Sequence, residues 1–506
     1  MAKIRNICKY FAMIVGVVIL VCIIRTFVLV NITKKKLPKC AKNETLGYFK
    51  LNDVIWERFK DTLRMRTVTH EMSEIQQMLN YVIEAHPKIF KSKHVQYEIV
   101  NGYSLLIHVQ GRDKTLLPYL LASHLDVVPV VEDEWHADPF DATENKDGTI
   151  VYARGAIDDK GSLMSKLAAL EFLLHRGILP KRSFYLGFGH DEEVLGPDGA
   201  PHIAKRLIEK DVNKLHFVLD EGMVVMKDVI PGSNKELAVI GVTERGFINL
   251  NISVEIHGGH SSIPHRETAV GVLGNAVSRL QYNQMPGRID SIVAEFLDSL
   301  APELSFPLNV FACNLWLFNP LWWRLFSLDN KLQGIVRTTT AVTIMRAGEK
   351  FNVIPSTAWA VVNQRTHHMD TVTQVMKHNK NVINDDRVQI NITRRQPPHP
   401  ISPFDRSTSL PYQVISDTID QIFDEVVIVP ATLVANTDTR CYLNFTKNIY
   451  RFNPISLTIE DIATIHAMDE RISKKNFERM INFFYHLMWN ADRIQPRDLT
   501  SNKQEL

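Results

Sequence analysis

Short apolar runs that end in histidine or carboxylate residues recur through the first half of this chain. The runs lie at residues 116–123, 183–190 and 215–219, and stretches with helical spacing of apolar residues lie between them at 160–175 and 200–210. Strands that alternate with helices predict an α/β fold, with a mostly parallel central sheet flanked by helices. Ligands bind such sheets at the carboxyl ends of the strands, which is where the polar residues fall.

From residue 246 the pattern changes to an α+β order. Strands are expected at 247–256, 338–346, 357–365 and 388–393, and helices at 267–280 and 371–382. This β-α-β-β-α-β order predicts an antiparallel sheet with helices on one face, here a lid or dimerisation domain inserted into the first domain. The predicted divisions are an N-terminal signal anchor or signal peptide with a stalk at 1–40, a catalytic domain at 46–245 and 397–496, the inserted lid domain at 246–396, and a tail at 497–506.

The composition excludes some classes of function and some kinds of metal site. The 506 residues include 58 Lys and Arg against 56 Asp and Glu, and this near balance of charge argues against a general nucleic-acid binder. The five cysteines are scattered and form no CxxC pair, which excludes a cysteine zinc site. Reactive groups are therefore to be sought among His, Asp and Glu.

Histidine and carboxylate residues gather in five places that could meet at one site. His124 and Asp126 stand two apart at a strand end, so both side chains point the same way. The other clusters are Asp158-Asp159 before a helix, Glu192-Glu193 and Asp220-Glu221 after strands, and the segment around His466. Each cluster alone is typical of a helix cap, a turn or a solvated acidic loop. Together, in this order and at the ends of predicted strands, the five clusters favour a metal centre for zinc or another divalent ion. Two ions would need one carboxylate that bridges them.

In their order along the chain and in their residues, these clusters resemble the motifs of the di-zinc amidohydrolases, a family that includes aminoacylase, carboxypeptidase G and carboxypeptidase S. The resemblance extends over about residues 48–495 and implies two zinc ions per subunit. It also implies that Glu192 is the general base, that Asp126 orients His124 from behind, and that the Asp158–Asp159 peptide is cis. The metal ligands that it implies are His124, Asp158, Glu193, Asp220 and His466, with Asp158 bridging both ions.

Motifs in the expected lid domain also match the family. The segment Gly258–Ser262 contains His260, which in the family reaches the active site of a dimer partner and stabilises the oxyanion of the reacting carbonyl. This role implies a homodimer, and the alternative is that the long insert at about 283–334 changes the interface or lets His260 serve its own subunit. Asn352 corresponds to a substrate-binding asparagine, and Arg365 at a strand end is a candidate for binding the substrate carboxylate. From the residues alone, the alternatives are a structural role for His260 and a surface salt bridge for Arg365.

Segments at 337–341, 435–440 and 449–452 narrow the resemblance to carboxypeptidase S and, more closely, to the animal N-fatty-acyl-amino-acid synthases/hydrolases. This branch implies attack of a metal-activated water on the amide of an N-acyl amino acid with a long fatty acyl chain. It also implies the reverse joining of a free fatty acid to an amino acid. A carboxypeptidase or dipeptidase on the same site is the alternative enzyme. A binding protein without activity is disfavoured, because all five metal positions and the base are present.

The N-terminus predicts entry into the secretory pathway. Basic residues precede an apolar run at 10–24, and this run could be part of a membrane span if Arg25 reaches the interface. We favour an uncleaved signal anchor over a cleaved signal peptide. Five Asn-x-Ser/Thr sites fit a luminal or extracellular catalytic portion, anchored or secreted: Asn31, Asn43, Asn251, Asn391 and Asn444. The last residues, Lys503-Gln504-Glu505-Leu506, resemble an endoplasmic reticulum retrieval signal.

The segment at 315–326, in the expected lid domain, is unusually aromatic. It predicts either ordinary lid core or an apolar surface for an acyl chain or a membrane. On the second interpretation, truncating Trp322 and Trp323 would weaken long-chain substrates more than acetyl ones.

Overall fold

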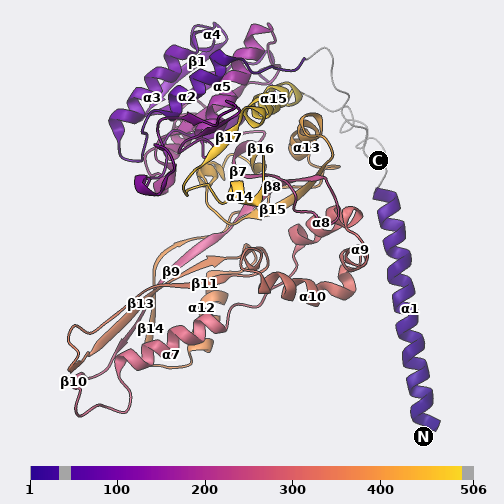
Figure 1. Ribbon diagram of the computed structural model, residues 1–506, viewed down its shortest axis with the longest axis vertical. Helices are drawn as coiled ribbons and strands as arrows, with labels where there is room; N and C mark the ends of the chain where they lie inside the picture. Colours follow the sequence, from indigo (N-terminus) through magenta and orange to yellow (C-terminus); the bar gives the residue numbers. More distant parts are fainter. Residues whose placement is uncertain (1, 34–46, 493–506) are drawn as a thin grey trace. The chain divides into compact units, whose positions relative to one another are not determined.

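The computed structural model describes residues 2–33 and 47–492 (Figure 1). The chain divides into two compact units. The lid unit consists of residues 2–33, 243–401 and 430–436, and the larger unit consists of the remaining described residues. The expected insert at 246–396 falls within the lid unit, and the N-terminal helix belongs to the same unit, which the sequence did not indicate. The predicted stalk beyond residue 33 and the tail at 497–506 lie outside the described residues.

An eight-stranded sheet organises the larger unit, in the order β1-β2-β6-β3-β7-β16-β8-β15. Neighbours among β6, β3, β7 and β16 run parallel, and β1 and β2 add to this core as antiparallel strands. The strands are β1 (Val95–Val100), β2 (Ser104–Val109), β3 (Tyr119–His124), β6 (Phe184–Gly189), β7 (Val218–Met226), β8 (Glu236–Glu244), β15 (Val426–Leu433) and β16 (Ile449–Leu457). Every residue of β3 and β6 is buried, as strands covered on both faces require. The predicted parallel central sheet is confirmed.

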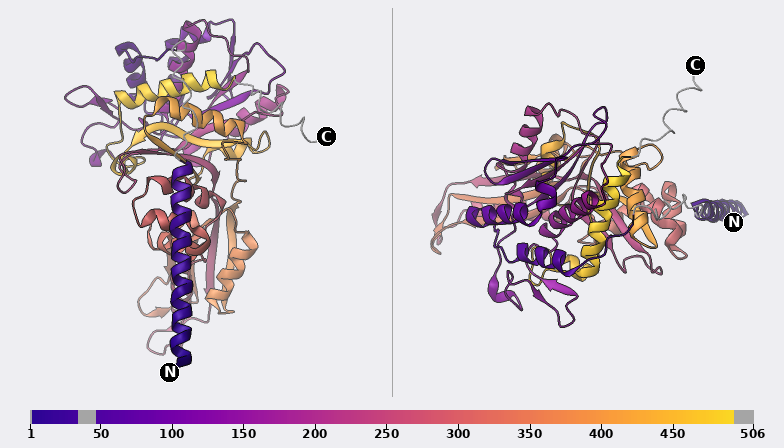
Figure 2. Two further views of the ribbon diagram at one scale, coloured as in Figure 1. Left: turned by 90° about the vertical axis from the view of Figure 1, so that its right-hand side faces the viewer. Right: turned by 90° about the horizontal axis from the view of Figure 1, so that it is seen from above.

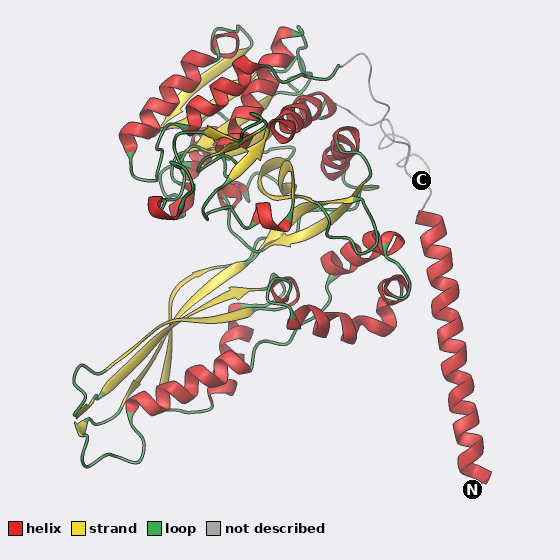
Figure 3. Cartoon of the chain, viewed as in Figure 1, coloured by secondary structure: helices red, strands yellow, loops and turns green. Residues whose placement is uncertain are grey.

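Helices cover this sheet (Figure 3). α5 (Lys160–His175) packs against β3 and α15, and its apolar residues are spread around the helix because it is buried on nearly all sides. The other helices are α2 (Asp53–Leu63), α3 (Met72–Ala85), α4 (Pro87–Phe90), α6 (Ala200–Glu209), α13 (Leu410–Ile422), α14 (Ile459–Ile462) and α15 (Lys474–Asn490), with short turns η1 (Glu132–Glu134), η2 (Glu192–Val194) and η4 (Asp438–Tyr442). A small sheet joins β4 (Thr143–Glu144), β5 (Ile150–Tyr152) and β17 (Arg471–Ser473).

The lid unit contains the predicted β-α-β-β-α-β order. Its antiparallel sheet has the order β11-β13-β9-β14, and α7 and α12 pack on it over one apolar core. The elements are β9 (Gly246–Glu255), α7 (Ala269–Tyr282), β11 (Thr339–Ala347), β13 (Thr357–Thr366), α12 (Val372–Ile383) and β14 (Val388–Gln396), with a two-stranded pair of β10 (Gly259–His260) and β12 (Val353–Ile354). The alternation along β9 places Ile248, Leu250 and Ile252 in the core, as period two requires.

A run of helices is inserted between α7 and β11, and the N-terminal helix α1 (Ala2–Thr33) packs against part of it (Figure 2). The inserted elements are α8 (Ser291–Leu300), η3 (Ala301–Glu303), α9 (Leu308–Cys313), α10 (Leu315–Leu328) and α11 (Gln333–Val336). In α10, Trp322 is buried and Trp323 is half-buried. Trp322 is therefore lid core, and the expected effect of truncating both tryptophans on long acyl chains stays a prediction. Within the described residues, α1 is the one helix that is long and apolar enough to cross a membrane.

Candidate metal centre

Asp158 faces a different histidine with each of its carboxylate oxygens. Its Oδ1 is 2.9 Å from His124 Nε2, and its Oδ2 is 2.9 Å from His466 Nε2. His124 ends β3, Asp158 lies just before α5, and His466 lies in the loop before β17 with a φ of +61°. A carboxylate placed in this way can bridge two cations.

Two more carboxylates complete the groups around the histidines. Glu193 Oε1 lies 3.3 Å from His466 Nε2, and Glu221 Oε1 lies 3.3 Å from His124 Nε2. Glu193 forms a group with His124 and Asp158, and Glu221 forms one with His124 and Asp159, in each of which the ligand atoms lie within 4.8 Å of one another. Mixed imidazole and carboxylate donors suit zinc and related divalent ions, and three protein ligands leave a position for water.

The hydrogen bonding of His124 shows that a cation fits between these groups. Nδ1 donates to the backbone carbonyl of Asp126 at 2.9 Å, so neutral His124 has an unprotonated Nε2. The Nε2 lone pair faces carboxylate oxygens of Asp158 and Glu221, which are also acceptors. Acceptors that face one another need a proton or a cation between them, and a divalent ion would satisfy all three groups together.

Besides Asp158, the carboxylate that faces His124 Nε2 is that of Glu221, the neighbour of the predicted ligand Asp220. Successive residues of a strand point to opposite faces, so the two carboxylates of this pair are not expected to face one ion. Asp220 is buried, and its Oδ1 accepts a hydrogen bond from the Glu221 backbone N–H at 2.9 Å. The geometry therefore favours Glu221, although the family resemblance pointed to Asp220.

Replacing Glu221 by glutamine should remove one of the two expected ions, because a neutral amide replaces the charged ligand. Asp220→Asn, a matched change one residue earlier, should keep both. Elemental analysis of each purified variant after removal of free metal checks this. Loss of an ion from Asp220→Asn with retention in Glu221→Gln would return the ligand role to Asp220.

Asp126 supports the centre through both its backbone and its side chain. Its carbonyl holds His124 Nδ1, and its carboxylate lies 3.4 Å from the same nitrogen. The carboxylate also accepts hydrogen bonds from the backbone N–H groups of Glu192 and Glu193, at 3.1 and 3.2 Å. The predicted orienting role thus extends to the turn that carries the expected base.

Glu470 is a supporting residue that the sequence did not reveal. It is fully buried, and its Oε1 accepts hydrogen bonds from the backbone N–H groups of Ile157 at 2.7 Å and Asp158 at 3.1 Å. Its Oε2 pairs with Arg154 Nη1 at 2.7 Å. Glu470 therefore fixes the loop that carries Asp158, whose peptide bond to the next residue is cis, as the resemblance implied.

Glu192 lies in η2 after β6, and its carboxyl group is buried. Burial raises the pKa of Glu192 well above its usual range; nearby Asp438 adds to this shift, and His124 opposes it. Burial also favours a higher pKa for Asp158, but hydrogen bonds with His124 and His466 outweigh it and lower that pKa. A carboxyl group with a raised pKa can accept and return a proton near neutral pH.

A sequence model of peptidase family M20/M25/M40 matches residues 120–490, which include every residue of this centre. The chain belongs to this family. It is 41% identical over 505 residues to an N-fatty-acyl-amino acid synthase/hydrolase of Xenopus tropicalis, with 97% of each chain covered. It is also 42% identical over 410 residues to a Dictyostelium discoideum protein named "Probable carboxypeptidase S-like 2", covering 80% of this chain and 78% of that protein.

The fold agrees with the family. A metallo-carboxypeptidase of family M20 from Sulfolobus solfataricus superposes with a TM-score of 0.59 at 17% identity, covering 87% of this chain and 99% of that one. The resemblance predicted from the motifs is confirmed by these comparisons.

The lid unit of this M20 chain holds His260 and Asn352 close together. His260 is on β10, which pairs with β12, and Asn352 directly precedes β12. Gly258 is required beside them, because a Cβ there would lie 2.6 Å from the carbonyl oxygen of Ile354. His260 Nδ1 accepts a hydrogen bond from the Ser262 N–H at 3.1 Å, so the neutral ring carries its proton on Nε2. The exposed ring therefore offers an N–H donor, which is what an oxyanion needs.

Arg365 lies near the end of β13, and its Nη1 donates to the side-chain oxygen of Asn436 at 2.8 Å. Its guanidinium also lies over the ring of Phe247 at 5.8 Å. Within the described part of the chain Arg365 makes no ion pair, so the surface salt bridge is not the arrangement seen. A half-buried guanidinium with an amide partner can still bind a carboxylate.

A third group of possible ligands, Asp290, His367 and His368, lies in the lid unit. Asp290 Oδ2 is 3.1 Å from Nε2 of both histidines. The Met369 N–H donates to His367 Nδ1 at 3.2 Å, so neutral His367 carries its proton on Nε2, towards Asp290. A protonated Nε2 cannot bind a metal, and we assign no ion to this cluster.

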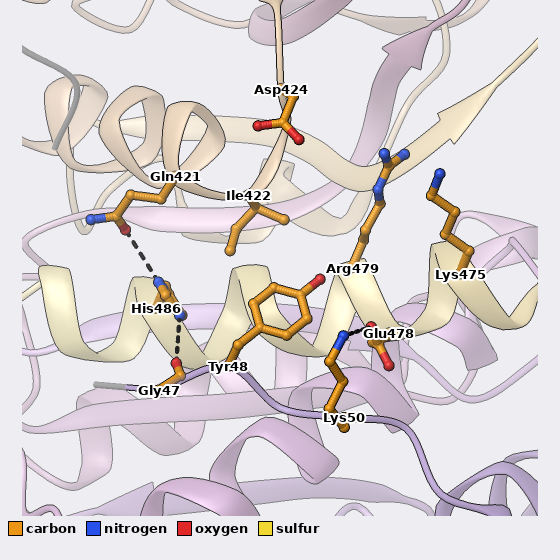
Figure 4. Close-up of a pocket in the computed structure, with 10 residues that line it drawn as sticks. All are labelled: Gly47, Tyr48, Lys50, Gln421, Ile422, Asp424, Lys475, Glu478, Arg479 and His486. Carbon is orange, nitrogen blue, oxygen red and sulfur yellow. Dashed lines mark hydrogen bonds and ion pairs between the residues drawn. The ribbon is translucent and has the colours of Figure 1, made fainter. Parts of the chain in front are cut away.

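A pocket of about 630 Å³ lies on the larger unit, between the segment after residue 47, the end of α13 and α15 (Figure 4). Charged side chains of both signs line it, and Lys50 Nζ pairs with Glu478 at 3.4 Å. Its lining contains none of the residues of the metal centre. We therefore do not place the reaction there.

Proposed function

We propose that this M20 chain is a two-metal amidohydrolase that cleaves, and in reverse forms, N-acyl amino acids with long fatty acyl chains. The observation that carries the proposal is Asp158, which faces His124 with one oxygen and His466 with the other. The relative from Xenopus tropicalis supports the substrate class by its name. We propose zinc as the metal, with His124, Asp158 and Glu221 around one ion and Asp158, Glu193 and His466 around the other.

Bound divalent ions would make a water molecule acidic near neutral pH and would polarise the amide carbonyl. Glu192 is the group of this chain that accepts the proton from the attacking water. It then passes that proton to the leaving nitrogen, which needs one to depart as an amine. In the reverse direction Glu192 takes a proton from the attacking amine and passes it to the departing hydroxide, which leaves as water.

In this proposal, residues of the lid unit bind the substrate. His260 would donate its Nε2–H to the carbonyl oxygen as negative charge develops there, and Asn352 beside it would hold the substrate. Arg365 would pair with the carboxylate of the amino acid. The family resemblance makes His260 a residue that serves a partner's site, so we also propose a homodimer.

We propose that the protein is anchored in a membrane of the secretory pathway, with its catalytic portion luminal or extracellular. The apolar length of α1, Asn6–Asn31, supports an anchor. The Asn-x-Ser/Thr sites at Asn251, Asn391 and Asn444 support a luminal side. The predicted retrieval signal at 503–506 lies outside the described residues.

The test is a comparison of three substrates with the purified full-length protein: N-oleoyl-phenylalanine, N-acetyl-phenylalanine and a blocked dipeptide. We expect kcat/KM for the oleoyl compound to exceed that for the acetyl compound by roughly 100-fold. Burial of three or four methylenes, each worth about 0.8 kcal/mol, is enough for this ratio. A chelator should abolish the activity, and product mass spectrometry measures it.

The other outcomes separate the candidate functions. Preference for the blocked dipeptide would favour a carboxypeptidase or dipeptidase, which the name of the Dictyostelium discoideum relative supports. No turnover of any substrate by protein with two bound ions would contradict the proposed substrate class.

A further inference from the structure

Arg365, the proposed partner of the substrate carboxylate, is held by a closed ring of hydrogen bonds within the lid unit. Its Nη1 donates to Asn436 Oδ1 at 2.8 Å. Nδ2 of the same asparagine donates to the backbone oxygen of Arg245 at 3.1 Å. Arg245 in turn donates through Nη2 to the backbone oxygen of Arg365. Asn436 therefore holds the guanidinium of Arg365, while Arg245 holds its backbone.

The side chain of Arg245, which lies between β8 and β9, is enclosed by the lid unit. The residue is 3% exposed, and its Nη2 also donates to the backbone oxygen of Arg337 at 2.9 Å. Gly334 on α11 lies against it, because a Cβ there would be 2.7 Å from Arg245 Nη1. A guanidinium covered in this way cannot touch a substrate. Arg245 can therefore act on a substrate only through Arg365 and Asn436.

Two positive charges meet at this place without an acid between them. Within the described residues neither Arg245 nor Arg365 makes an ion pair, and Asn436 is uncharged. Burial lowers the pKa of Arg245 to about 10, and the charge of Arg365 adds to this shift; Asp370 opposes it but pairs with Arg288. Buried charges in proteins are normally paired. The arrangement therefore predicts an anion that comes from outside the chain.

The contacts of Asn436 show why an amide is needed at this position. One end of its side chain donates to Arg245, and the other accepts from Arg365. A carboxylate could accept but could not donate, and its charge would neutralise that of Arg365.

We propose that Asn436 and Arg245 are positioning residues that determine specificity, because they fix Arg365 and leave its charge for the carboxylate of the substrate. This inference rests on the proposed function and narrows its substrate class. The chain would select N-acyl amino acids over N-acyl amines, which have no carboxylate to offer.

Two substitutions of Asn436 in the full-length protein test the proposal. Asn436→Asp keeps the shape and adds a charge, so it should pair with Arg365 in place of the substrate. We expect KM for N-oleoyl-phenylalanine to rise by roughly 30-fold or more, with kcat nearly unchanged. Asn436→Ala removes both contacts without adding a charge, and it should raise KM by only about tenfold.

N-oleoyl-phenethylamine, which lacks the carboxylate, separates recognition from stability. Its kcat/KM should differ little between the wild-type protein and Asn436→Asp, so that the preference for the acid falls. The matched control is Asn381→Asp, which adds the same charge at an exposed position of α12 and should leave both substrates unaffected. Bound metal and the melting temperature are measured for every preparation.

A smaller rise of KM in Asn436→Asp than in Asn436→Ala would overturn the proposal. A purely structural role is served better by aspartate, which keeps one of the two contacts. An equal loss of kcat/KM on the acid and the amine would overturn it as well. If the wild-type protein turns over the acid alone, the order of the two KM values decides. A wild-type protein with two bound ions that turns over neither would contradict the proposed function and this inference with it.

Discussion

Asp158→Asn should abolish turnover of N-oleoyl-phenylalanine, with a loss of roughly 10⁴-fold or more in kcat/KM. Each carboxylate oxygen of Asp158 lies 2.9 Å from a different imidazole. Asparagine keeps the shape but presents an NH₂ group to one histidine, so it cannot bridge two cations. The variant should also lose bound metal, which elemental analysis measures alongside the kinetics.

Asp147→Asn is the matched control, since Asp147 is exposed on the same unit and carries the same charge. It should keep both the metal and the activity. If Asp158→Asn retained two ions and its rate, the bridging role would be wrong and with it the observation on which the proposed function stands.

Glu192→Gln should lower kcat by roughly 10² to 10⁴-fold while both ions stay bound. Glutamine is close to glutamate in size but cannot accept the proton of the attacking water. Within the described residues Glu192 belongs to none of the groups of possible metal ligands, and its buried carboxyl group, whose pKa burial raises, can accept and return a proton. Kinetics and metal content of the same preparation check both parts.

The control here is Glu134→Gln, at an exposed position of η1. A Glu192→Gln protein that has lost an ion would make Glu192 a ligand. A Glu192→Gln protein that keeps its kcat would show that Glu192 is not the general base.

Much of the fold could be predicted because burial leaves a periodic signal. The helix expected at 371–382 matches α12, whose buried residues Val375, Asn379 and Ile383 follow at helical spacing, and the order of strands and helices in the lid unit follows the sequence pattern. The packing of α1 into the lid unit could not be predicted, because it depends on contacts between Arg25 and Asn314 and their partners, almost three hundred residues apart in sequence. The sequence also does not tell which face of α10 is buried, since apolar residues occupy both sides of this helix.

The site was predictable where chemistry restricts the residue type. His124, Asp158, Glu193 and His466 were named from the motifs, and the structure brings them together, while their roles stay predictions. Asp220 and Glu221 have the same chemistry, and only the direction of each side chain from β7 separates them. Glu470 has no signal in the sequence, because its partners are backbone N–H groups and Arg154, more than three hundred residues earlier.

The identity of the proposed ligands has a consequence for where in the cell this protein can work. Imidazoles and carboxylates hold metal only when deprotonated, so each ion taken up displaces protons, and acid opposes its binding. Burial lowers the pKa of His124, but Glu221, Asp126 and Asp158 outweigh it and raise that pKa, and hydrogen bonds with Asp158 and Glu193 raise the pKa of His466 to about 10. Protons therefore compete with the ions at both imidazoles, and we expect progressive release of the ions as the surroundings acidify. Metal retained after dialysis at a series of pH values would show this. A compartment close to neutral would keep the protein loaded, whereas delivery to an acidic vesicle would switch it off without any inhibitor.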